Sequence, residues 1–290
     1  MKTQQGTALA QWLAKVVDDF MLRSGHNNLG ESFPERAFDK PLLGFARGDD
    51  PLFRAMKEHV GPFHLTPAEI YRLSFPQEEV REEELTVISW VLPQTEATRR
   101  DNSSQKVFPS ERWARARIFG EQVNDKLRRH VVAELARKGI HSVAPVLTAH
   151  FKRMDSDRFV FASTWSERHV AFVAGLGTFG LCDGLITPLG KAMRLGSVVA
   201  KASIPPSPRP YAHHRQYCLF FTNGTCGKCI QRCPVGALGP EGHDKRKCVA
   251  HLRPASSDYV KANYGFDGYG CGLCQTGVPC EDRIPSVQDL

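Results

Sequence analysis

The sequence predicts a mixed α/β protein that ends in a cysteine-rich segment. Two observations predict it: strand and helix patterns alternate between about residues 84 and 147, and eight of the nine cysteines fall within residues 218–280. The 290 residues, of which 41% are hydrophobic and 24% charged, allow one large domain or two of ordinary size. We therefore expect three regions, with the bounds 1–83, 84–205 and 206–290.

The first region is expected to contain helices and loops. Trp12, Val16 and Phe20 repeat at helical spacing, and the following GHNNLGES ends that helix. Residues 33–51, rich in proline and glycine, predict a loop. A region with this much loop commonly covers a pocket.

A further helix start is marked within HLTPAEIYRL. Thr66 can cap the helix, Pro67 suits its first position, and Glu69 completes a capping box. The three residues together predict a helix that begins at Pro67.

The α/β pattern follows. LTVISWVLP (85–93) is a β-rich apolar run that ends in proline, so it predicts a buried strand. The polar QTEATRRDNSSQ (94–105) predicts a solvated loop. Residues 110–139 repeat apolar side chains four apart and end at Gly139, which predicts a long amphipathic helix. IHSVAPVL (140–147) predicts another short strand.

Glycines mark the next informative stretch. Gly175, Gly177 and Gly180 form G-x-G-x-x-G, a pattern of dinucleotide-binding folds. That fingerprint also needs a strand before it, a helix after it and an acidic residue about twenty positions on. Two more glycines and a proline follow closely and forbid a regular helix, and no acid stands near position 200. The sequence therefore disfavours dinucleotide binding.

The cysteine-rich segment has the spacing of an iron–sulfur protein. A two-cluster ferredoxin repeats C-x2-C-x2-C-x3-C-P, and the fourth cysteine of each half binds the cluster of the other half. CGKCIQRCP matches the last three cysteines of one half, and Cys218 upstream is the expected substitute for the first. The second half is stretched: Cys248 lies well upstream of CGLCQTGVPC, whose last cysteine comes after five residues instead of three.

Eight sulfurs suffice for two [4Fe-4S] clusters. By the crossing rule, one cluster is bound by Cys218, Cys226, Cys229 and Cys280, and the other by Cys233, Cys248, Cys271 and Cys274. Two C-x2-C pairs also suit a tetrahedral zinc ion, which would leave the other cysteines unexplained. Disulfides would need an oxidising compartment. Cys182, outside the segment, is expected to be a small buried apolar residue.

The order of these motifs resembles one superfamily. Glu167-Arg168 is followed by AGLG, by the LITP turn with Gly190, by the RLG triplet and then by the cysteines. In order and content, residues 84–290 resemble the epoxyqueuosine reductases and, in GLGTFGLCDGLITPLGKAMRLGSVV, the reductive dehalogenases. Both belong to one superfamily of cobalamin-dependent iron–sulfur reductases. The first region resembles them only weakly.

The resemblance implies a nitroreductase-like α/β domain that binds cobalamin (84–205), followed by a small two-cluster ferredoxin-like domain (206–290). Electrons would pass from an external donor such as ferredoxin or flavodoxin through both clusters to cobalt. Reduced cobalt would then cleave a carbon–oxygen or carbon–halogen bond of an unidentified small molecule or of tRNA. The cofactor-binding residues would be Gly175, Gly177, Gly180, Gly184, Thr187, Gly190 and Arg194. Glycines let backbone approach a bulky cofactor closely, and tight turns between packed elements are the alternative.

The chain departs from the family at the proton donor. Epoxyqueuosine reductases resemble one another in an aspartate a few residues before the Glu-Arg pair, and Phe161 stands there in this chain. Tyr211 and Tyr217 are candidates by position, with packing around a cluster as the alternative. His213 and His214 are expected in an exposed loop, with metal or phosphate contact as the alternative. A non-catalytic electron-transfer or scaffold protein that has lost cobalamin binding therefore remains the alternative function.

Charge and hydropathy limit the partners. The net charge is +7, from 38 basic and 31 acidic residues, but no basic stripe stands out, so a solvated surface explains it as well as RNA contact does. No apolar run reaches the roughly eighteen residues of a membrane span, and no export signal is present. We also expect no carboxy-terminal helical-repeat extension of the kind that some tRNA-acting members have. We expect a cytoplasmic protein with no membrane partner.

Overall fold

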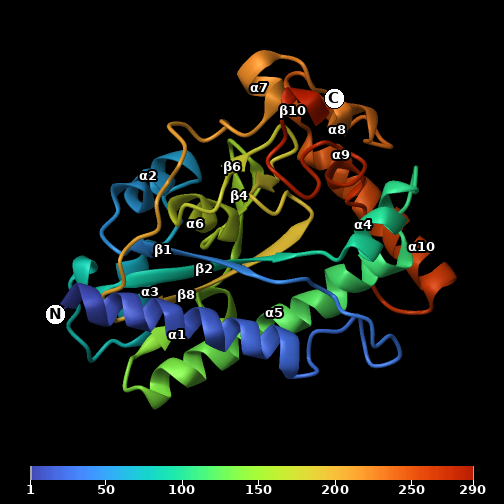
Figure 1. The fold of residues 1–290 in the computed structure, drawn as a ribbon. Coiled ribbons are helices and arrows are strands. Elements are labelled where there is room, and N and C mark those ends of the chain that lie inside the picture. The colour runs from blue at the N-terminus through green and yellow to red at the C-terminus, as the bar shows by residue number, and fades with distance from the viewer. Residues whose placement is uncertain (1, 290) are drawn as a thin grey trace.

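The structure is a computed structural model that describes residues 2–289. Its centre is a four-stranded antiparallel sheet in the order β1-β2-β8-β3 (Figure 1). β2 (Thr86–Pro93) pairs with β1 (Leu42–Arg47) on one side and with β8 (Met193–Ala200) on the other. β3 (Ser142–Val143) pairs with the last two residues of β8. The predicted strand at 85–93 is therefore confirmed as the second strand of this sheet.

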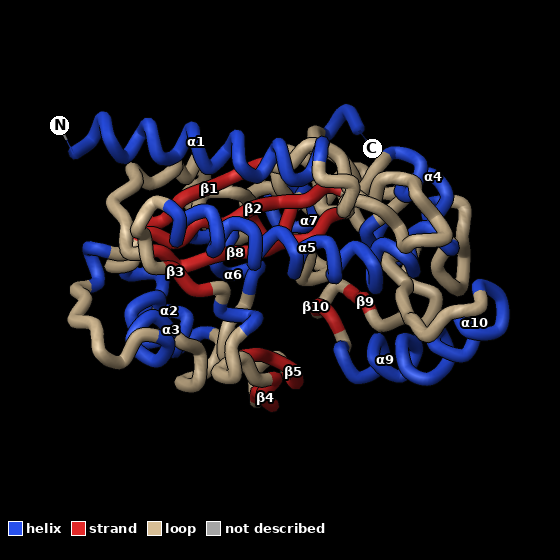
Figure 2. The backbone as a smooth tube through the Cα atoms, turned by 90° about the horizontal axis from the view of Figure 1, so that it is seen from below, coloured by secondary structure: helices blue, strands red, loops and turns tan. Residues whose placement is uncertain are grey.

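Helices cover both faces of the sheet, as Figures 1 and 2 show. α1 (Lys2–Arg23) and α5 (Glu111–Arg137) lie on one face. α6 (Glu167–Val173) lies on the other, together with α2 (Pro51–His59) and α3 (Pro67–Ser74). The long helix predicted after residue 110 is thus confirmed as α5, and α1 confirms the first predicted helix.

The two helical layers explain why β2 is apolar along its whole length. Ile88, Trp90 and Leu92 pack into the core beneath α1 and α5. Val87 and Val91 point the opposite way, into the core beneath α6. Because alternate residues of a strand face opposite sides, a strand covered on both faces needs apolar residues throughout.

The amino-terminal region has one strand that the sequence did not predict. β1 lies inside residues 33–51, which were predicted to be a loop, so that prediction is wrong for Leu42–Arg47. Only two of its six residues are fully buried, because β1 is an edge strand, and its apolar signal is correspondingly weak. The predicted start of α3 is confirmed: Thr66 and Glu69 form the reciprocal capping box.

The segment after β2 also differs from its prediction. Residues 94–105 form no solvated loop but contain α4 (Glu96–Ser103), which Thr95 caps. Thr98 and Asn102 of this helix are fully buried. The strand expected at 140–147 is shorter than predicted: it consists of the two residues of β3, and a 3-10 turn follows at Pro145–Leu147.

Two hairpins lie between α5 and β8. β4 (Arg153–Ser156) pairs with β5 (Val160–Ser163), and β6 (Thr178–Phe179) pairs with β7 (Leu185–Ile186). The glycine stretch thus begins after helix α6 and leads into a hairpin. A dinucleotide fingerprint has the opposite order, strand before and helix after, so the structure agrees with the rejection of that interpretation.

Short elements carry the cysteine-rich segment, which lies beyond α4 and the amino-terminal end of α5 (Figure 1). They are α7 (Leu219–Asn223), α8 (Lys228–Gln231), β9 (Leu238–Gly239), β10 (Gly242–His243), α9 (Lys245–Ala250), a π-helical turn (His251–Ala255), α10 (Ser256–Tyr264) and 3-10 turns at Leu273–Gln275 and Val287–Asp289. A further 3-10 turn precedes β2 at Glu82–Glu84. Within residues 2–289, no helix combines the length and the hydropathy that crossing a membrane requires.

Candidate metal centre

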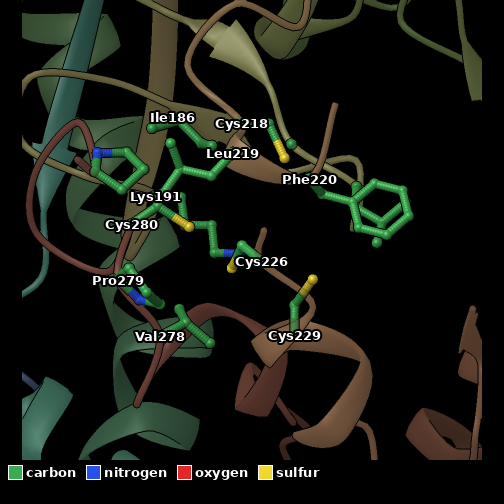
Figure 3. Close-up of a pocket in the computed structure, with 13 residues that line it drawn as sticks. Ile186, Lys191, Cys218, Leu219, Phe220, Cys226, Cys229, Val278, Pro279 and Cys280 are labelled. Atoms are coloured by element: carbon green, nitrogen blue, oxygen red, sulfur yellow. The ribbon is translucent and has the colours of Figure 1, made fainter. Parts of the chain in front are cut away.

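Four cysteines from separate turns line one pocket (Figure 3). Cys218 caps α7, Cys226 and Cys229 lie at the start of α8, and Cys280 comes from the loop that follows α10. The cavity between them has a volume of about 20 Å³, and apolar side chains such as Val278 complete its wall. These are the four cysteines that the crossing rule assigned to one cluster.

The other four predicted ligands gather around the turn that begins at Cys271. Burial raises the pKa of Cys271 to about 11, and the nearby thiols of Cys248 and Cys233 add to that shift. Cys233 also accepts a hydrogen bond from the backbone of Ala237 at 3.1 Å. Cys274 lies one turn on, and its thiol interacts with that of Cys182.

A single metal ion and an iron–sulfur cluster require different separations between the thiol ligands. Four thiolates around a tetrahedral zinc lie about 4 Å apart. In the part of the chain that the structure describes, no three Cys, His, Asp or Glu side chains are close enough to hold one ion. Clusters are wider, because sulfide ions separate their irons, and two groups of four cysteines match the ligand number of two [4Fe-4S] clusters.

The ninth cysteine lies beside these groups, which the sequence did not reveal. Cys182 is buried, as expected, but its sulfur accepts a hydrogen bond from Lys191 Nζ at 3.4 Å and contacts Cys274. Burial disfavours the charged form of Lys191, yet the surrounding sulfurs outweigh it and hold its pKa well above the usual value. The only signal in the sequence is one lysine within the otherwise uncharged stretch GLITPLGKAM.

Helix α4 holds the second cysteine group in place. Asn102 donates to the carbonyl of Cys271 at 3.1 Å and to the hydroxyl of Thr276 at 3.0 Å, and its oxygen accepts from the backbone of Ser110. Arg232 donates to backbone carbonyls both in this turn and in α4. Polar side chains predicted to be solvated therefore position the cysteine loop.

Three of the glycines proposed for cofactor binding pack against the chain itself. A Cβ on Gly177 would lie 2.2 Å from the carbonyl oxygen of Ile186, and one on Gly190 would lie 2.2 Å from that of Glu281. A Cβ on Gly175, where φ is +81°, would lie 2.3 Å from another backbone oxygen. Close packing accounts for these three glycines, as the tight-turn alternative expected.

The remaining loop residues of that set also lie near the cysteines. Gly180 lines the pocket of the first cysteine group, and Gly184 lies against Cys182. The hydroxyl of Thr187 donates to the carbonyl of Gly190 at 2.8 Å. The glycine loop therefore forms the wall between the sheet and the cysteine segment.

Arg194, on β8, belongs to a group of basic side chains. Its Nε is buried without a hydrogen-bond partner among the described residues, and Glu121 lies 3.8 Å from it. Burial and the neighbouring Arg117 lower the pKa of Arg194 to about 9. Arg117 donates to the hydroxyl of Tyr269 at 2.7 Å, and Arg253 lies 4.2 Å over the ring of that tyrosine. Glu121 also pairs with Arg128, so the positive charge of this group suits an anionic or strongly polar ligand.

The structure provides no strong acid at the expected place of the proton donor. Phe161, on β5, is 45% exposed. Tyr211 donates its hydroxyl to the carbonyl of Phe172, and burial raises the pKa of both Tyr211 and Tyr217. A raised pKa makes a phenol a poorer proton donor at neutral pH. His213 and His214 are exposed, as expected.

No protein-family model matches the chain. The epoxyqueuosine reductase of Bacillus anthracis is 34% identical over 119 residues, which is 39% of this chain and 29% of that protein. The one of Staphylococcus aureus is 29% identical over 160 residues, 53% of this chain and 40% of that protein. The matches thus span less than half the length of these curated relatives.

Solved structures agree over more of the chain. The match to an epoxyqueuosine reductase from Bacillus subtilis includes 96% of this chain and 69% of that protein, with a TM-score of 0.51 and 18% identity. The match to an epoxyqueuosine reductase solved with an epoxyqueuosine-modified stem loop of tRNA-Tyr includes 94% of this chain and 65% of that protein (TM-score 0.51, 19% identity). The match to a catabolic reductive dehalogenase in complex with 3-bromo-4-hydroxybenzoic acid includes 86% of this chain and 30% of that protein (TM-score 0.50, 14% identity). The chain has the fold of these two kinds of reductase, as the sequence motifs indicated.

Proposed function

We propose that this chain, which shares the fold of epoxyqueuosine reductases and reductive dehalogenases, is an iron–sulfur, corrinoid-dependent reductase. Two [4Fe-4S] clusters would deliver electrons from an external donor such as ferredoxin or flavodoxin, and the reaction would cleave a carbon–oxygen or carbon–halogen bond. The observation that carries the proposal is the pocket where Cys218, Cys226, Cys229 and Cys280 meet. Cys280 is distant in sequence from the other three, and a shared ligand such as a [4Fe-4S] cluster would account for four thiols that line one pocket.

The residues of this chain contribute unequally to cobalamin binding in this proposal. A bound corrinoid would supply a strongly reducing cobalt. At the glycines at 175, 177 and 190 the side where a Cβ would lie is filled by backbone of this chain, which makes them poorer candidates to contact it. Arg194 retains a buried donor without a partner, and Arg117 lies beside it, so these side chains are the better candidates to bind the polar periphery of the cofactor.

The same basic group bears on the substrate. Burial, with the neighbouring charge of Arg117, lowers the pKa of Arg194, and a phosphate or carboxylate placed there would stabilise the charged form. We therefore propose an anionic small molecule, or tRNA as in the relative that was solved with a stem loop. The test is the affinity of the chain for a tRNA stem loop. An affinity that falls steeply with salt concentration, and that is weaker for Arg194→Gln than for the parent, would favour RNA as the substrate. Affinity unchanged by that substitution would favour the small molecule.

The decisive experiment is cofactor analysis of protein purified without oxygen. We expect about eight irons per chain and an equal amount of sulfide. Added cobalamin should bind stoichiometrically with a spectrum shifted to the base-off form. Zinc in place of iron would refute the proposal.

A non-catalytic electron-transfer or scaffold protein is the second candidate, and one observation favours it. The position where a proton donor is expected holds the exposed Phe161, and the nearby hydroxyls are weak acids. Eight irons without any uptake of cobalamin would support this second candidate over the reductase.

A further inference from the structure

Lys191 lies where the two cysteine groups meet, and the cysteine segment itself fixes its backbone. Its N–H donates to the carbonyls of Cys280 at 3.0 Å and Glu281 at 3.1 Å. Gly190 before it has a φ of +72° and packs on the backbone of residues 281–282 so closely that no Cβ fits. The lysine cannot leave the cysteines without breaking these contacts.

The ammonium group is buried among sulfurs. The Lys191 residue is 3% exposed, and Nζ lies 3.4 Å from Cys182 Sγ. Figure 3 shows its side chain reaching into the space lined by Cys226 and Cys280. Lys191 lines the same pocket as Cys229 and Cys280, and the sulfurs of Cys182, Cys280, Cys229 and Cys274 are the groups that raise its pKa.

A buried ammonium is strongly destabilising unless a counter-charge lies close to it. A cluster bound by four thiolates supplies one, because its net charge is negative and becomes more negative on reduction. A fixed cation beside the cluster therefore stabilises the reduced form more than the oxidised form. Charge near a cluster and hydrogen bonds to its sulfurs are the means by which a protein sets its reduction potential.

The two clusters would feel this charge unequally. Lys191 lines the pocket of Cys218, Cys226, Cys229 and Cys280. Of the second group, only Cys274 is among the sulfurs that act on it most. Burial excludes the water that would otherwise weaken the interaction.

We propose that Lys191 is a positioning residue that raises the reduction potential of the cluster bound by Cys218, Cys226, Cys229 and Cys280 above that of the second cluster. Electrons from the donor then collect in the first cluster. The inference rests on the proposed function only in requiring that the clusters bind, and it does not depend on cobalamin.

The test uses the full chain, reconstituted with iron and sulfide without oxygen. Lys191→Met removes the charge at nearly constant length, and Lys191→Arg keeps it. The matched control is Lys228→Met, which removes the same charge next to Cys229 but from an exposed side chain. The midpoint potential of each cluster is measured by a redox titration followed by electron paramagnetic resonance.

We expect Lys191→Met to lower the potential of one cluster. At a fixed applied potential, its ratio of reduced to oxidised form should fall at least tenfold, which corresponds to about 59 mV for a one-electron couple. Lys191→Arg and Lys228→Met should stay near the original value. A fully loaded Lys191→Met protein with unchanged potentials would overturn the inference.

A second readout is the iron content of each reconstituted variant, which does not depend on cobalamin. If Lys191→Met binds less iron than the parent, the iron content of Lys191→Arg separates charge from side-chain shape. An iron content restored in Lys191→Arg would support a role of the charge, and an equal loss in both variants would overturn the inference. A parent chain that binds no iron at all would instead refute the proposed function.

Discussion

Individual cysteines should differ in what their replacement does to iron content. Cys229 lines the first pocket, whereas Cys182 contacts Lys191 and Cys274 from outside both proposed ligand sets. Cys229→Ser should therefore lower iron per chain and the solubility of the protein, because serine replaces a thiolate ligand poorly. Cys182→Ser should leave iron content intact. Both are measured as iron and sulfide in protein purified without oxygen, and equal losses in the two variants would contradict the ligand assignment.

A buried histidine should make the protein sensitive to acid. His64 is fully buried, stacks on Trp165 and accepts a hydrogen bond from the backbone of Ser166 at 3.2 Å. Burial, helped by the charge of Lys57, lowers its pKa to about 4. The pKa of His64 in the folded state lies below its unfolded value of about 6.5. The neutral, buried imidazole therefore contributes fully to the free energy of unfolding above pH 6.5, and this contribution is lost as pH falls toward 4.

Between pH 7 and pH 5 the free energy of unfolding should therefore drop by about 2 kcal/mol on account of this residue. Urea unfolding of His64→Gln at both pH values should show a smaller drop by that amount. The exposed His26 provides the control, and His26→Gln should keep the original dependence on pH. A pH dependence equal in His64→Gln and the parent would show that His64 takes up its proton in the folded state.

Helix α4 carries no proposed metal ligand, but it should stabilise the turn that begins at Cys271. Asn102 satisfies two acceptors, the Cys271 carbonyl and the Thr276 hydroxyl oxygen, and one donor, the Ser110 amide, and it is itself fully buried. Asn102→Ala leaves the carbonyl of Cys271 and the amide of Ser110 without those partners, which should lower stability by about 2–4 kcal/mol. The variant should also lose iron faster to a chelator.

Asn263→Ala is the matched control for this helix, because Asn263 is exposed and binds only a carbonyl within α10. It should change the free energy of unfolding by no more than about 0.5 kcal/mol. If Asn102→Ala unfolds like the control and holds its iron equally long, α4 does not anchor the loop.

Removal of the clusters should affect the two parts of the molecule differently. The sheet and its helical layers have two apolar cores of their own. The cysteine segment has a smaller core in which several members are the cysteines themselves, and its elements are short. Metal binding should therefore supply much of its folding free energy.

Hydrogen exchange followed by mass spectrometry should reveal this difference. After iron is chelated, amides from about residue 215 to 285 should exchange faster, while those in β2, β8 and α5 should keep their protection. Faster exchange throughout the chain would mean that the clusters stabilise the sheet as well. Unchanged exchange in the cysteine segment would mean that its fold does not need them.

Local and periodic patterns in the sequence determined several elements directly. The apolar run of β2, the four-residue repeat of α5 and the capping box of α3 each carry their signal within one segment. The cysteine spacing belongs with them, because ligand motifs are local. The likeness to epoxyqueuosine reductases and reductive dehalogenases was accessible for the same reason, since the motifs that carry it follow one another along the chain.

Contacts between distant segments decided the rest. β1 is a strand because its partner β2 supplies the hydrogen bonds, and α4 buries polar side chains because the loop of Cys271 meets them. Lys191 and Cys182 lie beside the cysteine groups for the same reason, although neither belongs to the cysteine motif. A sequence encodes the propensity of each segment, but whether a polar or charged side chain can be buried depends on the partner that folding brings to it.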